Sequence, residues 1–416
     1  MAKEQFINSL DIGTSYVRVV QSKLDPTNGK LAVIGAAIVP SFGMRKGVIV
    51  EVDEVVSSIS NAVEKVERMT GVPVSAVHVS VGGQHLVCFE SKGTIAVARA
   101  DGVIADSDIV RVVDSSQAVS LPPNREILHV LPRSFSLDGQ AGIKDPLGMS
   151  GIRLEVETAI IHAGIPFIKN LSRAVNQAGL TVLDIVAQPL ASAYAVLSRK
   201  HKELGSVCVD IGGGTTSLAV YEENTLLHAA VFPIGGINIT NDIAIGLRIS
   251  TDAAEKIKLQ YGAALPEYVG KNLNIELAKV DPESSDHVNK LDVIEIIQAR
   301  LEEIFRFVEL ELKKIGREGK LPAGVVLTGG TSQLLGLVDF AKNHLRLPAS
   351  LGTVKEVETI IDKVNDPSFS GTVGLVLWAN RYFVPREVTS VGAVFDSLLS
   401  SGFVLQLKKW FRSFLP

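Results

Sequence analysis

The feature that most constrains this chain is a set of three glycine-containing turns, each at the end of a strand-like apolar run. The turns are Asp11-Ile-Gly-Thr-Ser15, Asp210-Ile-Gly-Gly-Gly-Thr-Thr216 and Leu327-Thr-Gly-Gly-Thr331. Because glycine lets the backbone approach an anion closely, successive N–H groups in such turns form a concave site for phosphate. Three such turns in a fixed order, two of them nearly identical, predict a nucleotide clamped between two halves of the protein.

The predicted elements around these turns occur twice in the same order. Each half has a strand, a phosphate turn, two further strands, a helical region and a strand that ends in Gly-Gly. The strand-like runs of the first half are residues 6–10, 17–21, 31–36 and 77–81, and those of the second are 207–209, 218–221, 226–232 and 325–327. This order predicts an α/β protein with two related lobes. Residues 84–163 interrupt it and are long enough for a small α+β subdomain.

Helical periodicity is strong in two places. One helix is predicted over residues 52–69, and a second over residues 292–315, where apolar residues recur every three or four positions. Asp292 is the predicted N-cap of the second helix, and Gly316 is placed to end it at the C′ position.

Composition narrows the class of protein. The 416 residues are 46% hydrophobic and 21% charged, as in a well-packed protein of two or more lobes, and the formal charge of −4 provides no global attraction to nucleic acid. Cys88 and Cys208 are expected to be buried thiols in a reducing cytosol. No signal peptide is apparent, and no apolar run is long enough to span a membrane.

The two Asp-Ile-Gly turns, the Gly-Gly turn and the stretch Gln188-Pro-Leu-Ala-Ser-Ala-Tyr194 resemble the superfamily of actin, sugar kinases and heat-shock chaperones. Within it, the chain is most similar to the FtsA family of bacterial cell-division proteins, which tie FtsZ filaments to the membrane. The stretches that carry this resemblance are residues 125–132, 137–140, 142–149, 151–156 and 255–262. It implies an actin-like two-lobed ATPase fold with duplicated mixed sheets, an α+β insertion subdomain and a C-terminal amphipathic helix.

The expected division of the chain follows from this resemblance. Residues 1–84, 164–203 and 371–385 would form the first core subdomain, with residues 85–163 inserted. Residues 204–247 and 317–370 would form the second core subdomain, with residues 248–316 outside it. Residues 386–401 would be a tether, and residues 402–416 a membrane helix.

The resemblance also implies an ATP site with Mg²⁺. Asp11 and Asp210 would hold the hydrated cation, which prefers carboxylates together with retained waters. Arg18 either reaches toward phosphate or is a surface charge on its strand. The groups that would contact the phosphates, the ribose and the adenosine are Gly13, Thr14, Ser15, Gly212, Gly213, Gly214, Thr215, Thr216, Gly329, Gly330, Thr331, Glu255 and Lys258. Glu255 and Lys258 are one helical turn apart and could also be an ordinary ion pair.

Catalysis is left open by the sequence. Gln188 stands where relatives orient an attacking water, but glutamine is not a general base. Phosphoryl transfer depends on positioning and charge neutralisation more than on a base, so a slow ATPase is the most that is expected.

The C-terminal residues form an amphipathic pattern. Phe403, Leu407, Trp410, Phe411 and Phe414 make one apolar stripe, while Lys408, Lys409 and Arg412 lie off it. At about 1.5 Å per residue a helix here is too short to span a bilayer, but it suits the headgroup region of an anionic leaflet. The alternative is a helix docked on the protein's own core.

The resemblance implies four partners: the C-terminal peptide of FtsZ, further copies of this chain in a filament, an anionic membrane surface, and later divisome proteins. Lys290 and Arg300 are the expected contacts for the FtsZ peptide, with a solvated helix face as the alternative. The expected location is the cytoplasmic face of the cell membrane at the division site. Two other functions stay open, a PilM-like adaptor of pilus assembly and a small-molecule kinase of the same superfamily.

Overall fold

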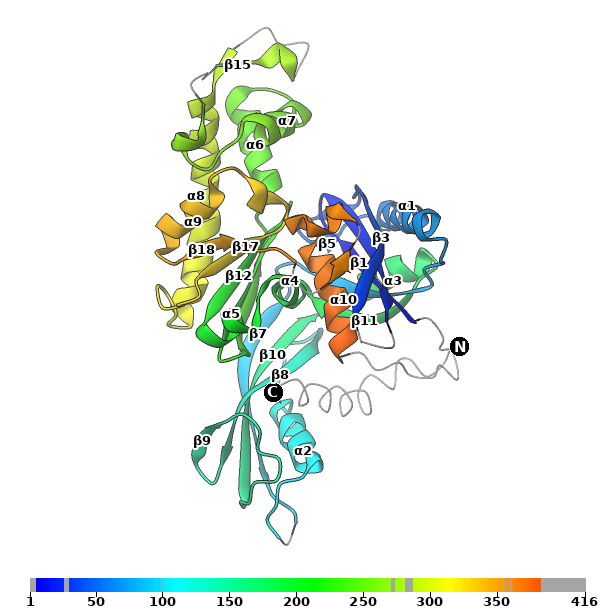
Figure 1. The fold of residues 1–416 in the computed structure, drawn as a ribbon, viewed down its shortest axis with the longest axis vertical. Helices are drawn as coiled ribbons and strands as arrows, with labels where there is room; N and C mark the ends of the chain where they lie inside the picture. The colour runs from blue at the N-terminus through cyan, green and yellow to red at the C-terminus, as the bar shows by residue number, and fades with distance from the viewer. Residues whose placement is uncertain are drawn as a thin grey trace.

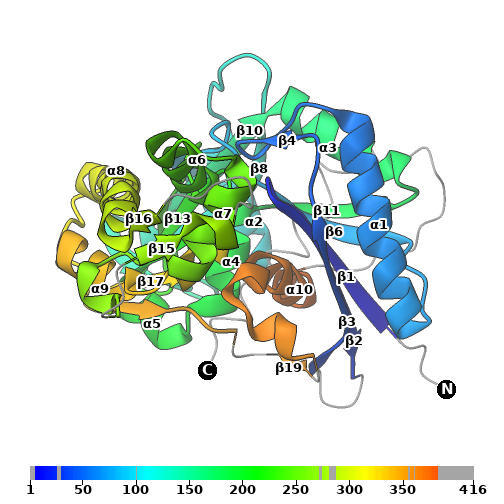
Figure 2. The ribbon, with the colours of Figure 1, turned by 90° about the horizontal axis from the view of Figure 1, so that it is seen from above.

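The computed structural model describes residues 5–25, 30–99, 101–270, 274–280, 287–354, 357–359 and 361–382. Two mixed β-sheets form the centre of the molecule (Figures 1 and 2). A smaller sheet subdomain extends from one end of this centre, and a group of helices extends from the other end. The phosphate turns lie in the two central sheets.

The first central sheet has the strand order β11-β6-β1-β2-β3-β19. Strands β1, β2 and β3 form an antiparallel meander, whereas β6 and β11 add in parallel on the other side of β1. The bounds are β1 (Gln5–Ile12), β2 (Tyr16–Leu24), β3 (Leu31–Pro40), β6 (Ala76–Val81), β11 (Thr181–Ala187) and β19 (Glu358–Thr359). Antiparallel neighbours need only short turns, and one of these turns is the first phosphate hairpin.

The second central sheet repeats this plan in the order β14-β13-β12-β17-β18. Again the first three strands are antiparallel and the last two join in parallel. The bounds are β12 (Ser206–Ile211), β13 (Thr216–Glu222), β14 (Thr225–Phe232), β17 (Val325–Thr328) and β18 (Ala349–Leu351). The predicted internal repeat is therefore confirmed, and it extends to strand order and direction.

Helices α4 (Gln188–Val196) and α10 (Ser370–Tyr382) lie between the two central sheets (Figure 2). Nearly every residue of both helices is buried, which explains why neither has a polar face in the sequence. Their backbones approach closely: a Cβ added to Gly374 would lie 1.8 Å from the carbonyl oxygen of Ala191. On the outer side of the first sheet, the amphipathic helix α1 (Val52–Thr70) packs on β2 and β3 and confirms the helix predicted there.

Helix α3 (Ile165–Gln177) covers the same sheet beside α1, and α5 (Arg199–Leu204) links α4 to β12. A two-stranded hairpin of β4 (Met44–Arg45) and β5 (Val48–Ile49) precedes α1.

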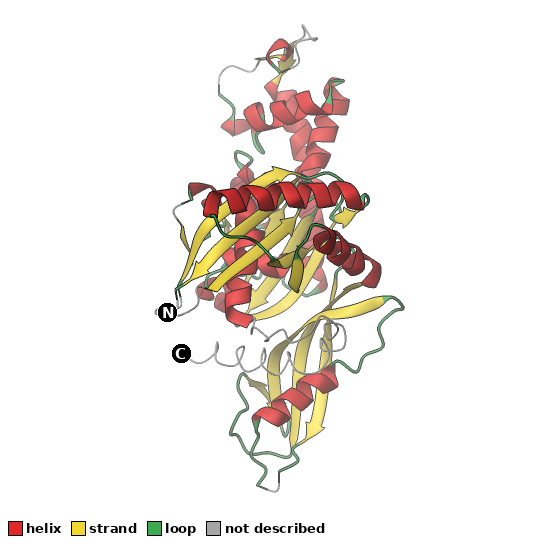
Figure 3. Cartoon of the chain, turned by 90° about the vertical axis from the view of Figure 1, so that its right-hand side faces the viewer, coloured by secondary structure: helices red, strands yellow, loops and turns green. Residues whose placement is uncertain are grey.

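The inserted segment forms a sheet of its own, in the order β7-β10-β8-β9, covered on one face by α2 (Asp106–Ser116) (Figures 1 and 3). Its strands are β7 (Val87–Ala96), β8 (Arg125–Leu137), β9 (Gln140–Ile143) and β10 (Arg153–Gly164). Gly93 on β7 lets α2 approach the sheet closely, because a Cβ at this position would lie 2.1 Å from the Val112 carbonyl oxygen on α2.

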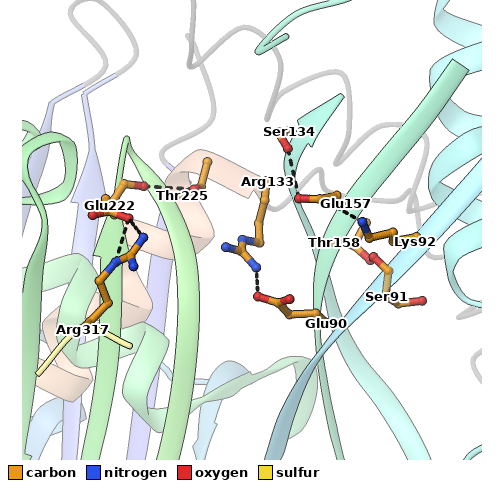
Figure 4. Close-up of polar contacts among 10 residues, drawn as sticks. All are labelled: Glu90, Ser91, Lys92, Arg133, Ser134, Glu157, Thr158, Glu222, Thr225 and Arg317. Atoms are coloured by element: carbon orange, nitrogen blue, oxygen red, sulfur yellow. Dashed lines mark hydrogen bonds and ion pairs between the residues drawn. The ribbon is translucent and has the colours of Figure 1, made fainter. Parts of the chain in front are cut away.

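The opposite face of this inserted sheet carries pairs of charges across its strands, which Figure 4 shows. Lys92 Nζ lies 2.7 Å from Glu157 Oε1, and Arg133 pairs with Glu90. One face is thus apolar and covered by α2, while the other is charged, as expected of an antiparallel sheet packed on one side only.

The outer helical group consists of α6 (Gly236–Leu247), α7 (Thr251–Tyr261), α8 (Lys290–Lys314) and α9 (Leu337–Leu345), with a small ribbon of β15 (Asn274–Glu276) and β16 (His287–Asn289). The long predicted helix is confirmed as α8, but the predicted N-cap is wrong. Asn289 caps the helix by accepting the Leu291 N–H, so the helix begins two residues before Asp292, which lies in its first turn. Gly316 follows the C-cap with φ of 67°, as predicted for C′.

Both cysteines are free thiols, but only Cys208 is buried as predicted, whereas Cys88 is half-buried. Four histidines lie in or beside strands in the first half of the chain. His78, His85, His129 and His162 are buried. Burial lowers the pKa of His129 to about 4, and its Nε2 accepts the Ala187 N–H at 3.0 Å.

The crossing of α4 and α10 yields a stability prediction. Gly374→Ala should lower the free energy of unfolding by about 1–3 kcal/mol or more, because the new methyl group must push the Ala191 carbonyl aside in a packed interior. Urea unfolding followed by circular dichroism measures this change. Gly270→Ala is the matched control, since a Cβ there meets nothing within 4 Å. Equal unfolding midpoints for the two variants would contradict the close crossing.

The buried His129 yields a prediction about pH. The pKa of His129 is lowered from 6.5 to about 4 in the folded protein. The stability that the neutral His129 contributes is therefore fully present above pH 6.5 and is lost as the pH falls toward 4. His129→Gln keeps an acceptor for the Ala187 N–H and removes this titration. Each unit of pKa shift corresponds to about 1.36 kcal/mol. Between pH 6.5 and 4 the free energy of unfolding of the variant should therefore fall by roughly 3 kcal/mol less than that of the wild type. Urea midpoints at pH 8 isolate the packing cost of the substitution, and parallel pH profiles for both proteins would contradict the prediction.

Candidate nucleotide site

The first two phosphate turns form the same backbone hairpin. Gly13 N–H donates to the Tyr16 carbonyl at 3.0 Å, and Gly212 N–H donates to the Thr215 carbonyl at 2.9 Å. Each hairpin joins the first two strands of its sheet, β1 to β2 and β12 to β13. At Gly13 a Cβ would lie 2.8 Å from the Tyr16 oxygen, so the tight turn requires glycine there. The repeated Asp-Ile-Gly motif therefore encodes a repeated local geometry.

The tips of the two hairpins lie against each other. A Cβ at Gly213 would lie 2.1 Å from Ser15 Oγ, and one at Gly214 would lie 2.6 Å from Thr14 Oγ1. Thr14 Oγ1 also accepts the N–H of Gly47 at 3.1 Å. The structure therefore brings together the hairpin residues that the sequence places about 200 positions apart, and side chains at Gly213 or Gly214 would fill the space between them.

The two aspartates at the head of the hairpins are buried and held by hydroxyl groups. Asp11 Oδ1 accepts from Ser80 Oγ at 2.6 Å. Asp210 Oδ2 accepts from Ser192 Oγ at 2.5 Å and from Gln188 Nε2 at 3.1 Å. Burial raises the pKa of Asp210, the two hydrogen bonds oppose this, and the nearby Asp11 charge raises it further. A second carboxylate close enough to raise the pKa of Asp210 in this way suits a divalent cation that both carboxylates share.

Arg18 supplies positive charge at the same place. Its Nη1 lies 3.8 Å from Asp11 Oδ2, and its guanidinium lies over the rings of Tyr16 and Phe369 at 5.6 and 5.7 Å. The side chain is only 11% exposed, so the alternative of a surface strand charge is wrong. Arg18 Nε is buried and has no hydrogen-bond partner, which leaves a donor available near the phosphate turns.

The third turn lies against the second hairpin. Gly329 adopts φ of 85°, which favours glycine, and a Cβ there would lie 2.2 Å from Asp210 Oδ1. Thr331 Oγ1 donates to the Gly212 carbonyl at 3.1 Å. Gly330 begins the 3₁₀ turn Gly330–Gln333. The third predicted turn thus joins the same site as the second hairpin, because β12 and β17 are parallel neighbours.

Glu255 and Lys258 lie on one face of α7 and point to the start of α6. Lys258 Nζ donates to Glu255 Oε2 at 2.6 Å, to Thr240 Oγ1 at 2.8 Å and to the Gly236 carbonyl at 3.2 Å. Gly236 in turn lies beside Thr331, since a Cβ at Gly236 would be 2.3 Å from Thr331 Oγ1. The ion pair is therefore present, and the contact of these two residues with adenosine stays a prediction.

Gln188 is the first residue of α4 and contacts the Asp210 carboxylate directly. Its Nε2 donates to Asp210 Oδ2 and to Ser192 Oγ, while Oε1 is buried without a hydrogen-bond partner. A carboxylate only accepts hydrogen bonds, so the Asp210 contact determines which end of the amide is which. Oε1 is therefore the atom left to accept a hydrogen bond in the site.

The donor set fits a hydrated magnesium ion. Among the described residues no three His, Cys, Asp or Glu side chains gather as a metal cluster. Mg²⁺ is usually bound through one or two carboxylates, with waters and phosphate oxygens completing the octahedron. Asp11 and Asp210 supply that number of carboxylates, and the glycine backbone of the hairpins supplies the place for phosphate.

Ser80, Ser192 and Thr240 are the site residues that sequence reasoning missed. None lies in a glycine turn, and each reaches the site only through strand pairing or helix packing. Ser192 does stand within the stretch Gln188–Tyr194 that carries the superfamily resemblance, which was the one available signal.

The predicted FtsZ contacts lie apart from this site, on α8. Arg300 Nε and Nη2 donate to Asp242 Oδ2 and Oδ1 at 2.6 and 2.9 Å, and Arg300 also pairs with Glu303. Lys290 Nζ lies 5.4 Å from the centre of the Tyr261 ring. Their role in partner binding stays a prediction. The predicted tether and membrane helix, residues 386–416, lie outside the described residues, and within the described ones no helix has the length and hydropathy needed to cross a bilayer.

Comparisons with known proteins agree with this architecture. The chain is similar to the PilM-PilN type IV pilus biogenesis complex, with a TM-score of 0.65 and 17% identity over 89% of this chain and 97% of that one. It is also similar to MreB 5 of Spiroplasma citri bound to AMPPNP, with a TM-score of 0.53 and 12% identity over 90% and 96%. These likenesses define the class of protein: the fold is actin-like.

Sequence comparison identifies the family within this class. A family model described as cell division protein FtsA matches residues 207–374, and one described as the SHS2 domain inserted in FtsA matches residues 83–162. The chain is 38% identical to cell division protein FtsA of Pseudomonas aeruginosa, over 98% of this chain and 97% of that protein. It is 38% identical to FtsA of Bacillus subtilis, over 92% and 85%. The chain belongs to the FtsA family of cell-division proteins.

Proposed function

We propose that this chain binds ATP and Mg²⁺ between its two hairpins, self-associates, and anchors FtsZ filaments to the membrane. The observation that carries the proposal is the apposition of Gly213 and Gly214 to Ser15 and Thr14, in a chain of the FtsA family. Two like hairpins that face each other offer backbone N–H groups to phosphates from both sides. Such a ligand would bridge the two lobes and bias their relative position.

In this proposal each part of the site has one task. Residues 13–15 and 212–216 contact the terminal phosphates, and Arg18 adds positive charge beside them. Gly329, Gly330 and Thr331 lie against the α-phosphate and ribose, and Glu255 and Lys258 contact the adenosine. Asp11 and Asp210 hold the hydrated Mg²⁺, which would neutralise phosphate charge. Gln188 Oε1 accepts a hydrogen bond from water, which permits at most slow hydrolysis because glutamine cannot act as a general base.

Anchoring is assigned to the C-terminal residues 402–416. Their apolar stripe would lie in the headgroup region of the cytoplasmic face of the cell membrane at the division site, and Lys408, Lys409 and Arg412 would contact anionic lipid. One helix would bind reversibly, whereas a filament presents many helices at once and gains avidity without new contacts. The fold likeness to the MamK double helical filament, with a TM-score of 0.51 and 14% identity, is consistent with self-association of this chain. Later divisome proteins would join through the assembled filament.

The second candidate is a PilM-like adaptor of pilus assembly, which the fold similarity to the PilM-PilN complex favours. Such a protein would share the hairpins and a peptide-binding role but would not need a membrane-seeking tail. A small-molecule kinase is a weaker alternative, and acceptor-dependent release of ADP would identify it.

Co-sedimentation with anionic liposomes tests the anchor. The full chain should pellet with the vesicles, and a chain that ends at Ser401 should stay in the supernatant. Trp410→Glu in the full chain should weaken binding roughly tenfold or more, because each large apolar side chain contributes roughly 1.5–3 kcal/mol when fully buried. Mg-ATP should strengthen pelleting of the full chain if it promotes filaments.

Two controls sharpen this test. Ser413→Ala keeps the apolar stripe and the charges and should bind like the wild type. Equal pelleting of the full and shortened chains would show that the tail is no anchor and would favour the pilus-type adaptor.

Binding of a labelled FtsZ C-terminal peptide, followed by fluorescence anisotropy, tests Arg300. Arg300→Glu should weaken binding about tenfold, since reversal replaces an attraction for the acidic peptide with repulsion. Arg306→Glu, at an exposed position on the same helix, is the matched control and should have little effect. Asp242→Asn frees the Arg300 guanidinium from its bidentate partner and should bind at least as tightly as the wild type. Full affinity of Arg300→Glu would remove this assignment.

A further inference from the structure

Each of the two carboxylates proposed to hold the metal, Asp11 and Asp210, accepts a hydrogen bond from a buried serine that lies outside the three glycine turns. Ser80 Oγ donates to Asp11 Oδ1 at 2.6 Å, and Ser192 Oγ donates to Asp210 Oδ2 at 2.5 Å. Ser80 is 5% exposed, and Ser192 is fully buried. Buried hydroxyl groups that donate to a buried carboxylate determine how the carboxylate is rotated, because its second oxygen must then face another direction.

The two serines come from different elements. Strand β6 runs parallel to β1 with Ser9 beside His78 and Leu10 beside Val79, so Ser80 follows beside Asp11. In the second sheet the same register pairs Asp210 with Thr328. Thr328, however, turns its hydroxyl to the Pro367 carbonyl at 3.1 Å. The hydroxyl for Asp210 is supplied instead by Ser192 on α4. Both halves of the repeat therefore have a hydroxyl group that donates to the aspartate, but this group comes from strand β6 in the first half and from helix α4 in the second.

Ser192 also restrains Gln188. The two residues are one helical turn apart on α4 and both contact Asp210 Oδ2, and Gln188 Nε2 lies 3.3 Å from Ser192 Oγ. The amide NH₂ is therefore held toward Ser192 and Asp210, and the buried Oε1 is left without a protein partner. A single hydroxyl orients both the carboxylate and the amide.

We infer that Ser80 and Ser192 are positioning residues for the cation. Resting on the proposed ATP and Mg²⁺ site, they orient Asp11 and Asp210 so that one oxygen of each carboxylate faces the hydrated ion. Asp11 Oδ2 lies on the Arg18 side, and Asp210 Oδ1 lies beside Gly329 at the start of the third turn. Partners that orient metal-binding groups in this way are typically needed for full metal affinity.

Titration of ATP binding with Mg²⁺ in the full chain tests this inference. Ser80→Ala and Ser192→Ala should each raise roughly tenfold the Mg²⁺ concentration at which the enhancement of ATP binding is half-maximal. This is near the lower end of the loss of metal affinity that follows removal of a group that orients a metal ligand. ATP affinity in excess EDTA should stay within about twofold of the wild type, because the serines act through the carboxylates and the ion. Ser80→Thr should restore the wild-type Mg²⁺ midpoint, since it returns the hydroxyl group within a strand.

Ser217→Ala is the matched control. Ser217 is buried and pairs with Asp210 across β12 and β13, but its hydroxyl makes no hydrogen bond to the carboxylate. Its removal should leave the Mg²⁺ midpoint unchanged. Thermal unfolding of every variant accompanies the titration. If Ser192→Ala does not fold, the comparison of Ser80→Ala with Ser80→Thr still tests the inference.

The outcomes separate this inference from the proposed function. Absence of ATP binding by the wild-type chain would overturn the proposed function itself. Magnesium-dependent binding with unchanged midpoints in both alanine variants would overturn only the assignment of the serines. An equal loss of ATP affinity with and without Mg²⁺ would also overturn it, since that result indicates a structural role.

Discussion

The close crossing of α4 and α10 between the two central sheets is the contact on which the rest of this structure depends. Gly374 allows the backbone of α10 to meet the Ala191 carbonyl, and a Cβ at Gly371 would lie 2.4 Å from Gln188 Nε2. Because the helices approach this closely, the sheets on either side can place their hairpins tip to tip. The same crossing puts Gln188 and Ser192 against Asp210. Interior packing therefore sets the geometry of the polar site.

The charges of the site are arranged around two buried carboxylates. Burial and the nearby Asp11 charge raise the pKa of Asp210, and the Ser192 hydroxyl and the Gln188 amide offset part of this shift. Arg18 adds a guanidinium at the Asp11 side, near the rings of Tyr16 and Phe369. Such an arrangement favours binding of a divalent cation together with phosphate. The cation offsets the negative charge of the two carboxylates and of the phosphate, and the Arg18 guanidinium adds positive charge beside them.

Much of the fold was predictable because it rests on local signals. The hairpins follow from Asp-Ile-Gly motifs, the strands from short apolar runs, and α1 and α8 from their periodicity. The predicted start of α8 was wrong because Asn and Asp are equally good N-caps, and in the structure it is Asn289 whose side chain accepts the Leu291 N–H. Arg18 could not be placed from its sequence context, because a strand residue faces inward or outward according to the sheet around it.

The sequence by itself determined the duplicated hairpins and the order of elements along each half. These depend on backbone preferences of short segments and on periodicity, which neighbours along the chain largely control. Only the tertiary structure decided that the hairpins touch, that Ser80 and Ser192 hold the two carboxylates, and that Arg300 is paired with Asp242. Those contacts join residues 18 to about 200 positions apart, and they arise from strand register and helix crossing, which no local pattern encodes.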